Sequence, residues 1–169
     1  KSFTTLESGV SADVALGKDV RSNSVGTDGF RNPSAAVNGM TNYTMRSNVW
    51  RSKSDANDKY LAVDLGKEYW LSHFIIKGAG TYGGTFKNAE NIIIQGSNSA
   101  SDYDGTTDNW LTIAHSYNRN NEAMFTTEKI LTATVSAYRY VRAYFPANNK
   151  ETVINLAEFE VYCAPADSI

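Results

Sequence analysis

The sequence "NLAEFEVY" at residues 155–162 carries the alternation that decides the fold class. Its odd-numbered positions are apolar from the third residue on: Ala157, Phe159 and Val161. Its even-numbered positions hold two acids, Glu158 and Glu160, together with Leu156 and Tyr162. A period of two residues is typical of a β-strand with one buried face. The pattern alone therefore places both acids on the outward face and leaves open whether either is a ligand.

Six further segments have strand patterns, and polar connections rich in Gly and Asn separate them. The predicted strands are 60–65, 72–77, 91–96, 110–116, 132–135 and 139–145. The segment 13–16 is either a short helical turn or a first strand. Short strands at this spacing, with no long helical pattern between them, favour an antiparallel sandwich or barrel. The long connections are where a β scaffold usually carries its functional residues.

The composition excludes several classes of protein. A chain of 169 residues predicts one domain with a substantial core. Its 16 basic and 18 acidic residues give a net charge of -2 without a long basic run, so nucleic acid is not an expected partner. No apolar run is long enough to span a bilayer as a helix. The single cysteine, Cys163, excludes an internal disulfide and a cysteine zinc site, and fits a cytosolic or a bacterial secreted protein.

Sequence motifs of catalysis are missing. The chain has no G-x-S-x-G, H-E-x-x-H, P-loop or G-x-G-x-x-G. Its two histidines, His73 and His115, lie within predicted strands, and we expect packed or surface residues there. A carboxylate pair for glycoside hydrolysis stays open, because the separation that matters is spatial. The segment 101–108 is similar to a calcium-binding loop but has the wrong spacing, so we expect a polar hairpin loop, with a second cation site as the lesser alternative.

Eight pieces of the chain occur in the order found in one protein family. They are "VALGKDV" (14–20), "AAVNG" (35–39), "VWRS" (49–52), "YLAVDLG" (60–66), "IIIQGS" (92–97), "NWLTIA" (109–114), "YRYVRAYF" (138–145) and "NLAEFEVY" (155–162). In this order they resemble the discoidin family, also called coagulation factor 5/8 type C, and in particular its bacterial carbohydrate-binding modules of family 32. No single piece is specific, but together they span about residues 14–162.

The resemblance implies an all-β fold: an antiparallel β-sandwich of the discoidin jelly-roll type, one domain over 1–169, with long loops at one end and adjacent chain ends. It implies a non-catalytic module, bacterial and secreted or at the cell surface, that holds the other domains of a parent protein on glycans. The expected ligand is a galactose-type sugar, an amino sugar or an acidic sugar, without membrane insertion. Two alternatives stay open: a discoidin-type adhesion domain that binds protein or membrane, and an enzyme such as a lyase on a jelly-roll scaffold.

The resemblance also implies one structural calcium ion. Its closing ligand is Glu158 of the last strand, and its side-chain ligand from the "AAVNG" turn is Asn38, where the family has Asp. The backbone carbonyls expected to complete the site are those of Ala35, Met40, Asn48 and Ala157. Calcium accepts amide and carbonyl oxygens, so Asn38 can serve with one negative charge less. The alternative is an Asn-Gly turn with an exposed glutamate, and Glu160 is expected to be a solvated strand residue.

The expected sugar site is assembled from loops. Galactose-binding relatives have His directly after the Trp of "VWRS", where this chain has Arg51, and an aromatic residue where it has Ser54. Galactose specificity therefore does not transfer, and Arg51 either contacts the carboxylate of an acidic sugar or is an ordinary surface residue. The other candidates, from the connections 78–90 and 146–154, are Tyr82, Phe86, Asn88 and Asn148. The two aromatic rings are either sugar platforms or loop anchors, while Trp50 and Trp110 are expected in the core.

Overall fold

The computed structural model describes residues 12–27, 32–40, 46–78, 91–117, 127–147 and 153–164, and it confirms the all-β fold. The strands are β1 (Asp19–Ser22), β2 (Trp50–Arg51), β3 (Lys59–Gly78), β4 (Asn91–Ser97), β5 (Leu111–Tyr117), β6 (Thr127–Phe145) and β7 (Asn155–Cys163). The described helices are short: the 3-10 helices η1 (Pro33–Val37) and η2 (Arg46–Asn48) and the α-helix α1 (Ala100–Asp104). Within these ranges, no helix has the length and apolar character needed to cross a membrane.

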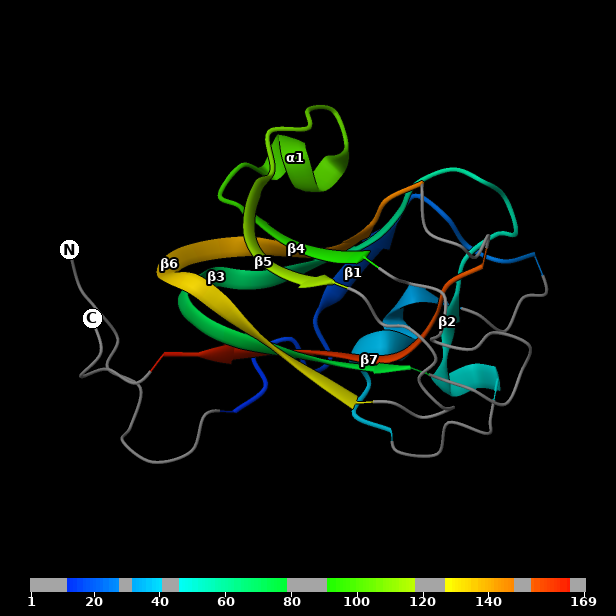
Figure 1. Ribbon diagram of the computed structural model, residues 1–169, viewed down its shortest axis with the longest axis horizontal. Helices are drawn as coiled ribbons and strands as arrows, with labels where there is room; N and C mark the ends of the chain where they lie inside the picture. The colour runs from blue at the N-terminus through cyan, green and yellow to red at the C-terminus, as the bar shows by residue number, and fades with distance from the viewer. Residues whose placement is uncertain are drawn as a thin grey trace.

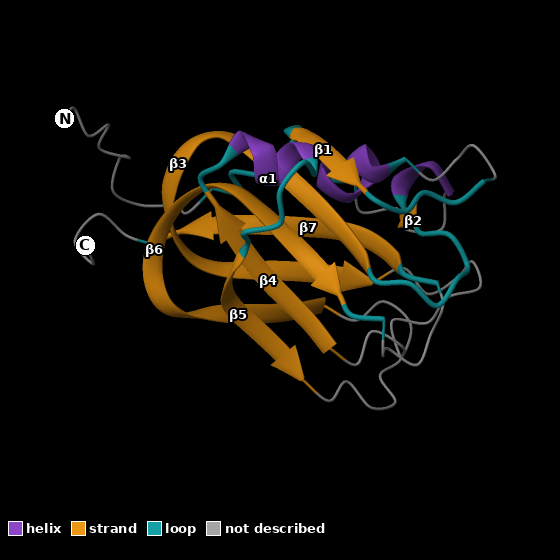
Figure 2. Cartoon of the chain, turned by 90° about the horizontal axis from the view of Figure 1, so that it is seen from above, coloured by secondary structure: helices purple, strands orange, loops and turns teal. Residues whose placement is uncertain are grey.

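One continuous antiparallel sheet supplies both layers of the sandwich. Its strand order is β2-β7-β3-β6-β4-β5, and β1 pairs with β3 outside this path. β3 and β6 are 20 and 19 residues long and pair with each other along most of their length. The first part of β3 lies beside β1 and the second part beside β7, so β3 passes from one layer to the other. Figures 1 and 2 show β3 and β6 curling over at one side, so that both ends of each strand lie at the opposite side.

The alternation of residues predicts two separate strands in the region of β3 and two in the region of β6, and the structure joins each pair. Register shifts in their pairing fall between Asp64 and Tyr69 and between Leu71 and His73. Gly66 lies within the first shift with a φ of 86°, and its amide donates a hydrogen bond to Asp64 Oδ1 at 2.7 Å. Such irregularities bend and twist a strand without ending its hydrogen bonding. Gly66 therefore marks a corner of β3 where the pattern had suggested a stop.

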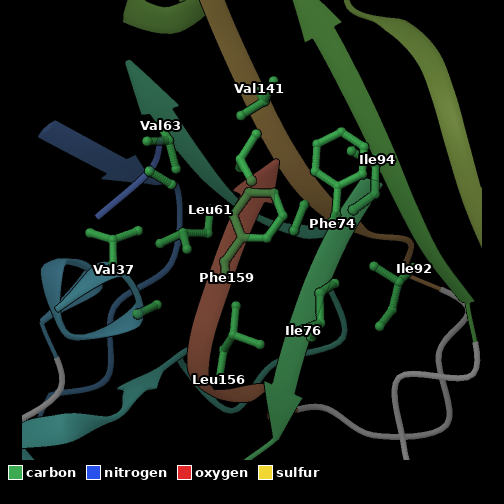
Figure 3. Packing of buried hydrophobic residues seen from close by; sticks show 14 of the residues in the cluster. Val37, Leu61, Val63, Phe74, Ile76, Ile92, Ile94, Val141, Leu156 and Phe159 are labelled. Atoms are coloured by element: carbon green, nitrogen blue, oxygen red, sulfur yellow. The ribbon is translucent and has the colours of Figure 1, made fainter. Parts of the chain in front are cut away.

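The apolar core lies between the two layers. Figure 3 shows side chains of β3, β4, β6 and β7 meeting there. Its largest fully buried side chains include Trp50, Phe74, Phe145 and Phe159. Trp50 is therefore a core residue as expected, and its ring centroid lies 6.1 Å from that of Phe145. Trp110 is buried in a second, smaller cluster that packs α1 onto the sheet.

The segment 101–108 folds differently from the expected hairpin loop. It begins within the helix α1, which ends at Gly105 with a φ of 80°. Asp102, 3% exposed, accepts hydrogen bonds from Ser97 Oγ, Thr107 Oγ1 and the Asn109 amide. Burial raises the pKa of Asp102, but these hydrogen bonds outweigh it and hold the pKa below its ordinary value. Both carboxylate oxygens are used to fold the segment, so the second cation site loses its support.

The two described ends of the chain lie side by side, as expected. Asp13 Oδ1 accepts a hydrogen bond from the Val161 amide at 2.9 Å, and the Val14 amide donates to the Val161 carbonyl at 2.9 Å. Asp13 Oδ1 also accepts from the Ala15 amide at 2.9 Å. The backbone from residue 14 onward forms a turn here, which settles the alternative between a helical turn and a first strand.

Candidate functional site

A bulge in β7 decides which of its side chains face away from the core. Lys77 and Gly78 are adjacent in β3, but their partners in β7, Glu158 and Leu156, are two residues apart. Ala157 is therefore the extra residue of the bulge. Leu156 and Phe159 both lie in the main core, although they are three positions apart. The strict alternation that grouped Leu156 with Glu158 is therefore wrong here, because the extra residue resets the period.

Glu158 is a buried carboxylate without a partner. It is 2% exposed, and among the described residues no hydrogen-bond donor reaches either oxygen. Burial raises its pKa to about 7, with help from the charges of Glu160 and Asp13 and against the opposing charge of Lys77. The expectation of an exposed glutamate is thus wrong. A buried charge with no compensation is strongly destabilising, so this position requires a cation or a proton.

Glu160, two positions further along β7, is compensated by the protein itself. Its carboxylate forms an ion pair with Lys77 Nζ and accepts a hydrogen bond from the Tyr162 hydroxyl at 2.6 Å. Its side chain is 12% exposed, so the expectation of a solvated residue is wrong. Tyr162 in turn stacks on His73, with ring centroids 4.6 Å apart. His73 is therefore a packed strand residue, as expected.

The helix η1 and the residues just after it contain three of the predicted calcium ligands: Ala35, Asn38 and Met40. η1 packs against β7, and Asn38 is its C-terminal cap. The Met40 amide donates a hydrogen bond to Asn38 Oδ1 at 2.8 Å. The Met40 amide also lies close enough to Glu158 to lower the pKa of that carboxyl, although the hydrogen bond of this amide goes to Asn38. Ala35, a third predicted ligand, is buried within η1.

The segment before β2 contains another predicted ligand, Asn48. The residue after it, Val49, packs against Ala157, which is itself a predicted ligand. Asn48 itself is buried. The predicted ligands are a carboxylate, an amide side chain and backbone carbonyls, which is the kind of set that calcium prefers. In the part of the chain that the structure describes, no three His, Cys, Asp or Glu side chains form a group that could hold a metal ion.

Arg51 ends β2 on a frame that is held from two sides. β2 pairs with β7, which places Arg51 opposite Asn155. The Gly26 amide donates to the Arg51 carbonyl at 2.8 Å, and the Ser52 amide donates to the Ile154 carbonyl at 2.9 Å. Arg51 is partly exposed, and Figure 1 shows β2 at the side of the molecule where β3 and β6 begin and end. This is the side where the expected sugar-binding loops leave the sheet.

Asn155 is a polar residue that no sequence motif marks as functional. It is 6% exposed, and neither amide atom has a hydrogen-bond partner among the described residues. An unpaired polar group in the interior costs about 1–3 kcal/mol. Within the described ranges, Asn155 and Glu158 supply all the buried side-chain atoms that lack a partner. An Asn at the start of a strand is ordinary in sequence, so no pattern could have revealed it.

The remaining sugar-site candidates lie outside the described residues. They are Tyr82, Phe86, Asn88 and Asn148. Their roles stay predictions.

The loop that follows Arg51 is held by a buried lysine. Lys59 is 3% exposed, and its Nζ donates to the Asp55 carbonyl at 2.8 Å, to Asp55 Oδ1 at 3.0 Å and to the Asn57 carbonyl at 2.7 Å. The Asn23 side chain binds the same loop, because its amide nitrogen donates to the Asp58 carbonyl at 3.1 Å. The loop is therefore anchored beside Arg51.

The chain belongs to the F5/8 type C family: the family model described as a NedA-like, galactose-binding domain matches residues 35–143, which is more than half of its length. With the β-sandwich fold, this match defines the class of the protein as a lectin-like carbohydrate-binding module. A comparison with curated protein sequences found no significant match.

Several solved structures are similar to this chain. A fucolectin from the serum of striped bass, Morone saxatilis, has a TM-score of 0.75 and 16% identity, over 93% of this chain and 50% of the fucolectin chain. A mutant lectin-binding domain of lectinolysin, complexed with Lewis b, has a TM-score of 0.70 and 18% identity, over 92% and 98%. Chitosan-binding module 1 of a chitosanase/glucanase from Paenibacillus sp. IK-5 has a TM-score of 0.65 and 24% identity, over 89% and 98%. At these identities the likeness shows the fold.

Proposed function

We propose that this chain is a non-catalytic module that holds a larger protein on glycans. The observation that carries the proposal is the placement of Arg51, a partly exposed charged side chain on a strand fixed from both sides by backbone hydrogen bonds. Sugars bind in sites where a rigid scaffold presents a few polar groups and aromatic faces. The fold relatives, which include a fucolectin and a chitosan-binding module, support a glycan as the ligand.

The ligand class and the setting are part of the same proposal. The family description supports a galactose-type sugar, the Paenibacillus module supports an amino sugar, and Arg51 supports an acidic sugar. We place the module on a bacterial secreted or cell-surface protein, a glycan-active enzyme or an adhesin, whose other domains are its partners. One cysteine in 169 residues is compatible with that setting.

We also propose that the module holds one structural calcium ion at Glu158. The support is the buried carboxylate that lacks a partner in the described structure. The other ligands in this proposal are the Asn38 side chain and the carbonyls of Ala35, Met40, Asn48 and Ala157. The ion would neutralise Glu158 and fasten η1 to β7. Because η1, η2 and β2 follow one another in the chain, the ion would also stabilise the base on which Arg51 is presented.

Glycan-array screening, followed by calorimetric titration of the glycans that bind, tests the function. We expect binding to at least one glycan class, without turnover of the glycan, and weaker binding by Arg51→Ala in protein whose circular dichroism spectrum shows the native fold. Lys67→Ala is the matched control, because Lys67 is an exposed cation next to the Gly66 corner of β3, a strand that does not pair with β2. A folded protein that binds no glycan would contradict the proposal.

A further inference from the structure

One row of side chains crosses the outer face of the layer that contains β4, β5 and β6. The strand pairing aligns one residue from each of four strands: His115 of β5, Ile93 of β4, Tyr144 of β6 and Tyr60 of β3. Each of them is next in sequence to a residue of the main core, so the four side chains point away from that core. All four are partly exposed. We call these four residues the outer row.

The part of the outer face beside the outer row is covered by the protein itself. Ala62, two positions after Tyr60, is fully buried although it also points away from the main core. It packs in the second cluster with Tyr103 of α1, Trp110 and Tyr140. Figure 1 shows α1 on this side of the sheet, away from β7. Tyr60 packs against this cluster but stays partly exposed, so the cover includes Ala62 and leaves the outer row partly open to solvent.

Arg142 holds two rings of the outer row in place. Its Cζ lies 5.1 Å from the ring centroid of Tyr60 and 5.0 Å from that of Tyr144. The same guanidinium donates to Gln95 Oε1 at 2.7 Å and to Asp108 Oδ1 at 2.9 Å, so its charge is compensated. The two rings are thus fixed before a ligand arrives, which lowers the entropy lost on binding.

The four side chains of the outer row carry no charge at neutral pH. Burial lowers the pKa of His115, so its imidazole is neutral. Burial raises the pKa of Tyr144, and the charge and hydrogen bond of Asp58 raise it further, so the hydroxyl keeps its proton. The outer face of an antiparallel sheet is commonly polar, whereas this row has three rings and an isoleucine. Uncharged rings with polar tips match neutral sugars and offer no attraction to a polyanion.

We propose that the outer row is a second glycan-binding face, for a neutral sugar chain that lies across the strands. Neighbouring strands are about 4.8 Å apart, so the row spans about 14 Å and can contact more than one sugar of a chain. Tyr60 and Tyr144 would stack on sugar rings, with Ile93 and His115 extending the contact along the row. The sugar site expected from the resemblance lies in loops at the end of the sandwich. This inference rests on the proposed function and adds a second site to it.

Heteronuclear NMR titration of the whole isotope-labelled chain tests the site, with cellohexaose, maltohexaose, lactose and a heparin hexasaccharide as probes. We expect at least one neutral hexasaccharide to shift the backbone amide signals of the outer row and to bind about tenfold more tightly than lactose. Its affinity should not fall as sodium chloride is raised, because salt screens only charged contacts. The heparin hexasaccharide should leave these signals unchanged.

Two outcomes of the titration separate this inference from the proposed function. If neither hexasaccharide, nor any glycan that binds on the array, shifts the signals of the outer row, the inference is overturned and the proposed function remains. Binding of the heparin hexasaccharide at the row would also overturn it. Binding of no glycan anywhere on the chain would remove both proposals.

Substitutions test the individual residues, with circular dichroism to confirm that each variant is folded. Tyr144→Ala should weaken binding of the neutral hexasaccharide about tenfold, because one stacked ring is lost. His115→Asp should also weaken it, because the bound sugar would desolvate the new charge. Trp70→Ala is the matched control, since it removes an exposed ring from another part of β3 and should leave the affinity unchanged.

Unchanged affinity in both outer-row variants, or an equal loss in Trp70→Ala, would contradict the proposed face. If Tyr144→Ala does not fold, the comparison of His115→Asp with Trp70→Ala decides.

Discussion

Replacing Glu158 by Gln tests the buried carboxylate directly, because the change removes the charge and keeps the size of the side chain. Without a cation, the pKa of Glu158 is raised from 4.5 to about 7. A carboxyl whose folded pKa exceeds its unfolded pKa stabilises the fold at low pH, and this contribution is lost as the pH rises through the folded value. The calcium-free wild-type protein should therefore lose stability between pH 4.5 and about pH 7.

The size of the loss follows from the two pKa values. Their difference, at about 1.36 kcal/mol per pH unit, corresponds to about 3 kcal/mol of unfolding free energy. This is an upper value, because Glu160 and Asp13 interact with the same charge. In a domain of this length, 1 kcal/mol moves the melting temperature by about 2–4 °C. Glu158→Gln does not ionise, so without calcium at alkaline pH it should melt above the wild type by up to about 6–12 °C.

Calcium should largely cancel this difference. A ligand at a hundred times its dissociation constant stabilises the fold by about 2.7 kcal/mol, and the wild type gains this whereas Glu158→Gln does not. Thermal melts followed by circular dichroism, in calcium and in chelator at acidic and alkaline pH, measure both effects. Glu160→Gln is the matched control, since it loses the ion pair with Lys77 under all conditions but keeps the calcium response. A calcium response in Glu158→Gln equal to that of the wild type would refute the reasoning.

Three further substitutions test other parts of the fold. Lys59→Met removes an ammonium group that donates to three acceptors, so the free energy of unfolding in urea should fall by about 2 kcal/mol. Unchanged stability would show that the loop does not depend on Lys59. Gly96→Ala places a Cβ 2.6 Å from the ring of Tyr138 and should destabilise by about 1–3 kcal/mol in the same assay, unless the ring moves without loss. Arg142→Lys removes the guanidinium that stacks on Trp110, with Arg142 Cζ 4.7 Å from the ring centroid. This change should alter tryptophan fluorescence and lower the unfolding free energy by about 1–2 kcal/mol. An unchanged spectrum would contradict the packing.

Alternation along the sequence located most of the strands to within one or two residues. The expected strand at 91–96 is β4 (Asn91–Ser97), and the expected strand at 155–162 is β7 (Asn155–Cys163). It could not show that β3 continues through Gly66, because a glycine after an apolar run is equally typical of a turn. The pairing partner decides between the two, and β6 stays hydrogen-bonded to β3 on both sides of this corner.

The candidate cation site shows a similar division. The resemblance to discoidin domains pointed to Asn38 and Glu158, and the fold brings η1, which Asn38 caps, against the strand that carries Glu158. Whether Glu158 faces water depends on the bulge at Ala157, which a strict period of two cannot represent. Glu160 differs from Glu158 because its charge is compensated by Lys77, which comes from another strand, β3.

The sequence by itself determined an antiparallel β-sandwich and its family, because alternating burial is a local property of each strand and eight short motifs in order identify the family. Only the tertiary structure decided that the Glu158 carboxylate is buried, and that neither it nor the amide of Asn155, across from Arg51, has a hydrogen-bond partner among the described residues. Burial and cross-strand position are set by segments that are far apart in the chain. A pattern read along the sequence therefore cannot assign them.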